Sequence, residues 1–209
     1  MASERAYLAR FSRTERAVHW VHAVAFFVLL GTGLALYIPQ LSVLIGRRPL
    51  LKDIHVYTAV AWIVALVAVI VLGDRRRLRA TLRDFDRFDE DDVRWLRKQK
   101  PAPQGRFNAG QKVNAALTGA FAVLFTVSGG LLWLGERDHR FQFAGSILLH
   151  DWVTFISIIL VVGHLYLALI YPATRHALRG ITRGTVRRDW AEHHHPKWAA
   201  EQPPVDAPQ

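Results

Sequence analysis

The chain has 209 residues, enough for one domain, and its charge and its hydrophobicity occupy separate stretches of the sequence. Hydrophobic residues make up 51% of the chain, although its formal net charge is +10. This segregation is typical of a membrane protein, whereas a soluble basic domain spreads its charge between short apolar stripes. The sequence has no cysteine, which excludes iron–sulfur clusters, thioether-linked haem and disulfides within this chain.

Four apolar stretches are long enough to cross a membrane as helices. They cover residues of about 18–38, 54–72, 113–134 and 147–171. Each approaches or exceeds the roughly 20 residues that span about 30 Å of hydrocarbon. The first stretch ends in Tyr37-Ile38-Pro39 without a small-residue cleavage site, so we interpret it as a retained helix and not as a signal peptide.

The basic residues between these stretches predict how the chain is oriented. Arginine and lysine are frequent in the N-terminal segment, in the second connection and in the tail, and sparse in the other two connections. Because basic connections stay on the cytoplasmic side, both termini are predicted to be cytoplasmic. The predicted fold class is all-α, an integral membrane four-helix bundle over residues 1–200, followed by a disordered tail at 201–209 that is rich in proline.

The second connection has apolar residues spaced three to five positions apart between its charges. This spacing favours one or two amphipathic helices at the cytoplasmic surface, with a solvated charged loop as the alternative. No internal repeat is evident along the chain. The apolar positions in the second connection are Leu78, Leu82, Phe85, Phe88, Val93 and Leu96.

Histidines in or beside the apolar stretches are the main candidates for function, since an ionisable residue inside a membrane is costly. Two of them, His150 and His164, are 14 residues apart on one predicted helix. That spacing puts them within roughly 40° of one face and about 21 Å apart along the axis. The topology then predicts two pairs at matching depth, one outer and one inner. The five histidines are His19, His22, His55, His150 and His164.

The outer pair is predicted to be His55 with His150, and the inner pair His19 with His164. Two imidazoles that face each other across a bundle suit axial ligation of a haem iron and leave no open position on it, so such a centre transfers electrons. Zinc is disfavoured because it prefers four ligands at one depth. Two other interpretations compete with haem ligation. Each histidine could simply form a hydrogen bond to a neighbouring helix, or the histidines could carry protons in a transporter.

Several other side chains could support such a site, each with a structural alternative. Depth alone does not choose between His19 and His22. Arg13 and Arg16 could form ion pairs with haem propionates, or they could only anchor the chain at the cytoplasmic surface. The carboxylate of Asp151 could orient a neighbour by a hydrogen bond. Glycines provide flat space for a porphyrin or close helix packing; they are Gly31, Gly33, Gly129, Gly130 and Gly163. The run 193–195 of three histidines is expected to be a solvated docking segment, with weak metal binding as the alternative.

From about Phe11 to Trp198 the sequence resembles the cytochrome b (gamma) subunit of membrane-bound formate dehydrogenases. The Asn-Ala-Gly-Gln-Lys string and the His-His-Pro tail are the more specific parts, because the four histidines would also fit relatives that serve hydrogenases or thiosulfate reductases. The matching strings are Arg16-Ala17-Val18-His19-Trp20, Ile54-His55, Phe107-Asn108-Ala109-Gly110-Gln111-Lys112, Leu148-Leu149-His150, His164-Leu165-Tyr166, Arg188-Asp189-Trp190 and His194-His195-Pro196-Lys197-Trp198.

The resemblance implies a respiratory role in the bacterial inner membrane, with His19, His55, His150 and His164 as the iron ligands of two haem b groups. It also favours His19 over His22, because the family's ligand lies directly before the tryptophan. Electrons would pass from an iron–sulfur beta subunit through both haems to a membrane quinone, either menaquinone or ubiquinone.

The segment with Asn108, Gly110 and Gln111 is expected to bind the quinone beside the inner haem, with an ordinary helix cap at Asn108 as the alternative. The resemblance assigns formate oxidation to a molybdenum or tungsten alpha subunit, so we expect no catalytic residue in this chain. No nucleic-acid partner is expected. A cytochrome b subunit of another respiratory dehydrogenase is the alternative function.

Overall fold

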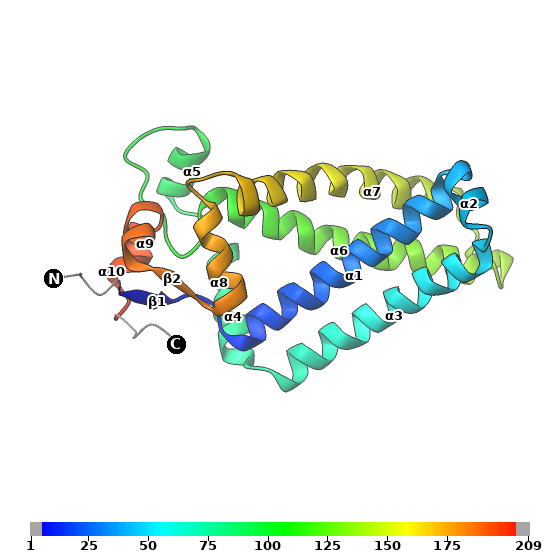
Figure 1. The fold of residues 1–209 in the computed structure, drawn as a ribbon, viewed down its shortest axis with the longest axis horizontal. Helices are drawn as coiled ribbons and strands as arrows, with labels where there is room; N and C mark the ends of the chain where they lie inside the picture. Colours follow the sequence, from blue (N-terminus) through cyan, green and yellow to red (C-terminus); the bar gives the residue numbers. More distant parts are fainter. Residues whose placement is uncertain (1–5, 204–209) are drawn as a thin grey trace. The chain divides into compact units, whose positions relative to one another are not determined.

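Four long helices dominate the computed structural model, which describes residues 6–203 (Figure 1). All four are long and apolar enough to cross a membrane. Many of their large apolar side chains are exposed, which suits a surface in contact with lipid and not with water. The helical membrane bundle predicted from the sequence is confirmed, and of the predicted tail only residues 201–203 lie within the described part. The spans are α1 (Arg13–Tyr37), α3 (Arg48–Leu72), α6 (Ala109–Gly135) and α7 (Ala144–Leu165), which continues into the π-helical turn η2 (Tyr166–Ile170).

Each spanning helix begins a few residues before the apolar stretch that predicted it. Helix α3 starts at Arg48 and not near residue 54, because Pro49 sits in the first turn, where its missing N–H costs nothing. Helix α6 starts at Ala109 and not near residue 113, because Asn108 caps it. Polar residues can therefore form the first turn, which the hydropathy pattern does not detect.

The amphipathic helices predicted in the second connection are confirmed as α4 (Arg75–Asp86) and α5 (Glu90–Leu96). The two short strands, β1 (Tyr7–Ala9) and β2 (Thr185–Arg187), were not predicted; they pair antiparallel. The remaining elements are α2 (Pro39–Ile45), η1 (His139–Phe141), η3 (Arg175–Ala177), α8 (Leu178–Arg183), α9 (Arg188–His194) and α10 (Pro196–Ala200).

The chain forms two compact units, of which the first, here the terminal unit, contains residues 6–16, 76–121 and 157–203. Its core lies under the β1–β2 ladder, where the fully buried Leu8 and Val186 are paired in register. Ala191, Trp198 and Ala199 complete this core. Gly184 ends α8 with a positive φ of 85° and accepts hydrogen bonds from two backbone N–H groups of the N-terminal segment. Since a Cβ at Gly184 would lie 2.8 Å from the Phe11 carbonyl oxygen, only glycine fits there.

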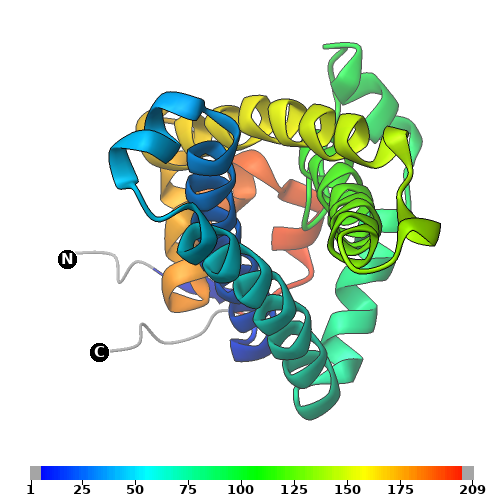
Figure 2. The same ribbon diagram turned by 90° about the vertical axis from the view of Figure 1, so that its right-hand side faces the viewer.

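The second unit, here the helical unit, contains residues 17–75 and 122–156. Within it α3 lies along α1, and α7 lies along α6 (Figures 1 and 2). Side-chain contacts cross between the pairs, since the Tyr37 and Phe155 rings lie 5.6 Å apart and Lys52 forms an ion pair with Glu136 at 2.5 Å. Segments of all four long helices therefore contribute to this unit.

Candidate functional site

The predicted outer histidine pair is brought together in the helical unit. His55 of α3 and His150 of α7 face each other with ring centroids 6.2 Å apart and an interplanar angle of 65°. Phe125 of α6 lies against the second imidazole, with its ring centroid 5.2 Å from that of His150. Each histidine lies about two turns after the start of its helix, so the depth match inferred from the topology holds for this pair.

A hydroxyl group holds the Nδ1 atom of each of these imidazoles. Thr32 Oγ1 lies 2.9 Å from His55 Nδ1, and Ser128 Oγ lies 3.0 Å from His150 Nδ1. Both hydroxyls also donate to a carbonyl one turn earlier in their own helix, that of Val28 at 2.8 Å and that of Leu124 at 2.6 Å. Each hydroxyl has a single hydrogen, so its oxygen is left to accept from the imidazole N–H.

A glycine follows each hydroxyl residue and supports the same imidazole ring. A Cβ at Gly33 would lie 3.4 Å from His55 Cε1, and a Cβ at Gly129 would lie 3.4 Å from His150 Cε1. The two rings therefore rest against helix backbone. By contrast, a Cβ at Gly31, Gly130 or Gly163 would have no neighbour within 4 Å, so only two of the five expected glycines contact a histidine.

The donor atoms and the ring separation suit two imidazoles that would hold one metal ion between them. Two metal–nitrogen bonds of about 2 Å each, with the half-widths of two imidazole rings, give a centroid separation of about 6 Å. The protonated Nδ1 atoms leave the Nε2 lone pairs for the metal, and the Nδ1 hydrogen bonds fix this tautomer. A zinc site of the usual kind does not fit, because the described residues hold no group of three or more metal-ligating side chains.

The other three membrane histidines have different surroundings. His22 packs within the helical unit, with its ring centroid 5.6 Å from that of Trp62 on α3 and 6.3 Å from that of Phe26. His19 contacts Trp20, with ring centroids 5.3 Å apart. His164 is exposed and lies near the end of α7, in the terminal unit. The predicted pairing of His19 with His164 joins residues of different units and stays a prediction.

The expected quinone-binding segment forms the cap of α6 in the terminal unit. Asn108 Oδ1 accepts from the Gln111 N–H at 2.9 Å, and Gln111 Oε1 accepts from the Asn108 N–H at 3.0 Å. This is a reciprocal capping box. It uses both side-chain oxygens and leaves the two amide NH2 groups as donors. Both side chains are half-buried, so these donors remain within reach of a ligand.

Neighbouring side chains hold the capping segment in place. The indole of Trp95 lies over Gly110, where a Cβ would come within 3.0 Å of the ring. Lys112 donates to Asp92 at 2.6 Å and to the Arg87 carbonyl at 2.8 Å, and the carboxylate of Asp92 also caps α5. The start of α6 is therefore fixed against α5 by a glycine contact and a buried ion pair.

Of the two arginines considered as partners of a haem propionate, Arg16 forms hydrogen bonds within the protein. Arg16 donates through Nε to the Ile181 carbonyl at 3.2 Å and through Nη2 to the Thr182 carbonyl. These carbonyls belong to the last turn of α8, where a positive charge is favourable. Arg13 is exposed.

The histidine run 193–195 was expected to be solvated, and for His195 this is wrong. His195 is 1% exposed: its Nδ1 donates to the Gly105 carbonyl at 2.8 Å, and its Nε2 accepts from Arg10 Nη2 at 3.1 Å. Burial, followed by the charge of Arg10, lowers the pKa of His195 to about 3. The neutral ring therefore joins the N-terminal segment, the second connection and the C-terminal segment.

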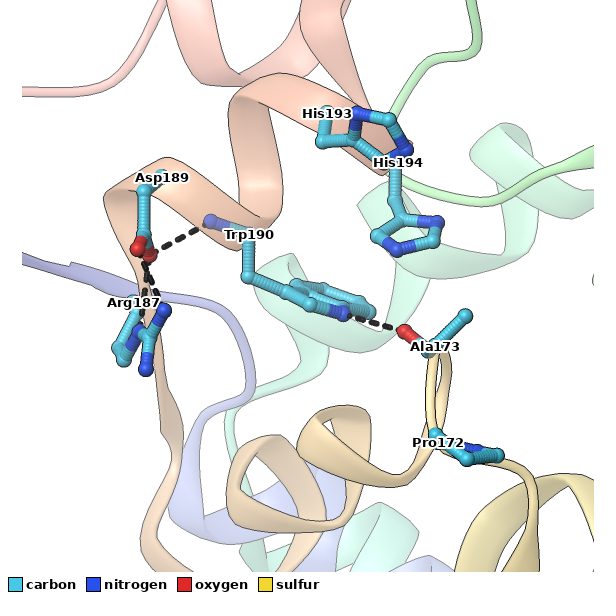
Figure 3. A pocket seen from close by; sticks show the side chains of 7 residues that line it. All are labelled: Pro172, Ala173, Arg187, Asp189, Trp190, His193 and His194. Carbon is cyan, nitrogen blue, oxygen red and sulfur yellow. Dashed lines mark hydrogen bonds and ion pairs between the residues drawn. The ribbon is translucent and has the colours of Figure 1, made fainter.

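A shallow hollow lies beside the other two histidines of this run (Figure 3). Trp190 is one of the residues that line it and donates through Nε1 to the Ala173 carbonyl at 2.9 Å. His193 is exposed, and the ring of His194 lies 4.8 Å from that of Trp190. The lining residues are Pro172, Ala173, Arg187, Asp189, Trp190, His193 and His194.

The fold is that of a multi-pass helical membrane protein in which two imidazoles from different spanning helices lie side by side. Comparison with known families assigns this class: a family model described as prokaryotic cytochrome b561 matches residues 10–184, and the chain belongs to that family. Cytochromes of the b type carry haem b, which agrees with the geometry of His55 and His150.

The chain is also similar to several bacterial proteins, each 25% identical to it. One is a formate dehydrogenase cytochrome b556 subunit of Haemophilus influenzae, aligned over 93% of this chain and 83% of the relative. Two are from Escherichia coli K12. The nitrate-inducible formate dehydrogenase cytochrome b556(Fdn) subunit aligns over 95% of this chain and 93% of the relative. The formate dehydrogenase cytochrome b556(fdo) subunit aligns over 93% of this chain and 92% of the relative. The resemblance inferred from the sequence strings is thus confirmed.

Two site residues, Thr32 and Ser128, were not anticipated. The residue that contacts the Nδ1 atom of His150 is Ser128, while the expected role of Asp151 in orienting a neighbour stays a prediction. The signal that could have identified them is the pair of dipeptides Thr32-Gly33 and Ser128-Gly129, which precede His55 and His150 by nearly equal distances in the sequence.

Proposed function

We propose that this chain is the di-haem cytochrome b subunit of a formate dehydrogenase complex, which passes electrons from an iron–sulfur subunit to membrane quinone. Membership of the cytochrome b561 family and the names of the relatives support this role. The observation that carries it is the His55–His150 pair, with ring centroids 6.2 Å apart and with both Nδ1 atoms bonded to hydroxyls.

His55 and His150 would hold the outer haem. When bound by two imidazoles, haem iron has no open position and carries one electron at a time. The protein supplies the two Nε2 lone pairs and holds both rings through Thr32 and Ser128. Apolar helices around the pair keep water away from it, which favours electron transfer over chemistry at the iron.

His19 and His164 are proposed to hold the inner haem, near the cytoplasmic surface. The support is the helical spacing from His150 to His164 and the start of α1 near His19. The basic N-terminal segment, second connection and tail support cytoplasmic termini in a bacterial inner membrane. Electrons entering on the outer side and protons taken up on the inner side would then build a transmembrane potential.

The quinone, menaquinone or ubiquinone, is proposed to bind at Asn108, Gly110 and Gln111. The capping box supports this, because it fixes two amide NH2 groups at one helix start as donors for a quinone carbonyl. Formate oxidation itself would occur in a molybdenum or tungsten alpha subunit, with an iron–sulfur beta subunit between that site and this chain. We propose no formate-oxidising site in this chain.

Purification of the tagged chain from its native membrane tests this function. We expect reduced b-type absorption bands, two haems per chain, and co-purifying iron–sulfur and molybdenum- or tungsten-containing subunits identified by mass spectrometry. A colourless protein would contradict the haem assignment and favour a proton carrier. Co-purification of hydrogenase or thiosulfate reductase subunits would keep the electron-transfer role but replace the formate dehydrogenase assignment.

A further inference from the structure

We infer that Thr32 and Ser128 are positioning residues for the iron ligands: their hydroxyls fix the tautomer and the ring orientation of His55 and His150 and lower the redox potential of the haem bound there. This inference rests on the proposed haem at that pair. Both contacts lie within the helical unit, and neither residue is a metal ligand or part of the predicted quinone segment.

The direction of these hydrogen bonds follows from counting hydrogens. A serine or threonine hydroxyl has one hydrogen and two lone pairs. Ser128 directs its hydrogen to the Leu124 carbonyl at 2.6 Å and Thr32 directs its hydrogen to the Val28 carbonyl at 2.8 Å, with the Leu29 carbonyl at 3.2 Å. The hydroxyl oxygens are therefore acceptors, and both imidazoles must carry their proton on Nδ1.

The same local arrangement occurs twice in a chain that shows no sequence repeat. In α1 and again in α6, a hydroxyl residue bonds the imidazole Nδ1 and the glycine after it supports Cε1 at the 3.4 Å contact distance. A hydrogen bond at Nδ1 and a backbone contact at Cε1 restrict rotation about the last side-chain bond. The ring plane of His55 is thus set by contacts between α3 and α1, and that of His150 by contacts between α7 and α6, and neither depends on a metal.

This arrangement also has an electronic consequence. An imidazole that donates from Nδ1 is a stronger electron donor through Nε2, which favours the ferric over the ferrous iron. Ser128 is fully buried, so loss of its oxygen would leave the His150 N–H without an acceptor in surroundings of low polarity. Removing the Ser128 hydroxyl should therefore raise the midpoint potential of this haem, and removing that of Thr32 should raise it less, because His55 also has a backbone hydrogen bond with Leu29.

The test compares Thr32→Val and Ser128→Ala with the wild type in the purified complex. Potentiometric titration followed at the b-type bands should show an upward shift for one of the two haems, while the other keeps its potential. The low-spin ferric electron paramagnetic resonance signal of the same haem should broaden or move, because its ring planes are no longer fixed. Thr32→Ser and Ser128→Thr keep the hydroxyl and should restore both wild-type readings.

Thr126→Val is the matched control. Thr126 also lies in α6 and donates to a carbonyl one turn earlier, that of Ala122 at 2.8 Å, but it bonds no histidine. This control should change neither the potential nor the resonance signal. The inference is overturned if Thr32→Val and Ser128→Ala bind both haems with unchanged potentials and unchanged signals. Absence of b-type haem from the wild type would instead contradict the proposed function itself, so the two failures are distinct.

If either variant assembles poorly, Thr32→Ala and Ser128→Cys provide a second comparison. Cysteine keeps the size of serine but is a weak acceptor, so the potential should rise in Ser128→Cys with the complex intact. An unchanged potential in an assembled Ser128→Cys complex would count against the inference.

Discussion

The imidazole of His55 lies 6.2 Å from that of His150, centroid to centroid, and joins the second and fourth spanning helices at matching depth. Both residues follow a helix start by about two turns. Helices α3 and α7 therefore enter the bundle from the same side. The relationship was predicted from helical spacing and topology, and it supports the proposal that these two histidines hold the same haem.

Substitution of the paired histidines should remove haems in a pattern set by this geometry. His55→Ala and His150→Ala are each expected to lose the same haem, which is half of the total, because one imidazole cannot complete the bis-histidine site. His19→Ala and His164→Ala should lose the other haem. Haem extraction combined with redox titration checks which centre remains. Loss of the same haem from His55→Ala and His164→Ala would contradict the pairing.

His22 is expected to be dispensable for haem binding. Its ring packs against Trp62 and Phe26, so His22→Ala should cost about 1 kcal/mol of stability through lost packing and leave two haems per chain. Absorption spectra and haem-to-protein ratios of the purified variant measure this, with His19→Ala as the matched comparison one turn away. If His22→Ala lost a haem while His19→Ala kept both, the ligand would be His22.

The buried His195 should make the stability of the terminal unit sensitive to acid. Burial, followed by the charge of Arg10, lowers the pKa of His195 to about 3, so the folded chain keeps the ring neutral while the unfolded chain binds a proton below about 6.5. The stabilising contribution is complete above pH 6.5 and is lost progressively as the pH falls toward 3. We therefore expect the thermal unfolding midpoint in detergent to be lower at pH 5 than at pH 7.5.

The matched variants for this prediction are His195→Asn and His193→Asn. Asparagine at 195 can still donate to the Gly105 carbonyl but does not titrate in this range, so the difference between pH 5 and pH 7.5 should shrink. His193 is exposed, and its substitution should leave that difference unchanged. An equal pH dependence in the wild type and in His195→Asn would show that other groups cause the acid sensitivity.

Hydropathy and helical period were sufficient to predict the four spans and the depth of the outer pair, since both depend on local sequence alone. The supporting hydroxyls could not be predicted, because serine and threonine in a spanning helix most often bond only their own backbone. The burial of Ser128 and the approach of His150 to it distinguish this residue from Thr126, and neither can be read from the local sequence. The burial of His195 was also missed, since it depends on Arg10 and Gly105, which lie far away in the sequence.

The capping box at Asn108 and Gln111 makes it possible to separate a helix cap from a quinone contact. Asn108→Ala removes both the cap oxygen and the amide donor, and should cost about 1 kcal/mol of stability. Asn108→Asp keeps an oxygen that can accept from the Gln111 N–H, and aspartate is also a good cap. It lacks the NH2 group proposed as the quinone donor and adds a negative charge at the same place.

We expect Asn108→Asp to keep wild-type stability and both haems, which should still be reduced by formate. Reoxidation of those haems after addition of quinone should be slowed by about five- to tenfold, since one lost hydrogen bond to a ligand is worth about 1–1.5 kcal/mol. Gln111→Glu, which likewise keeps its oxygen and loses its NH2 group, should slow reoxidation in the same way. Stopped-flow spectroscopy at the b-type bands measures both rates. If both acidic variants reoxidised at the wild-type rate, the segment would be a cap and the quinone would bind elsewhere.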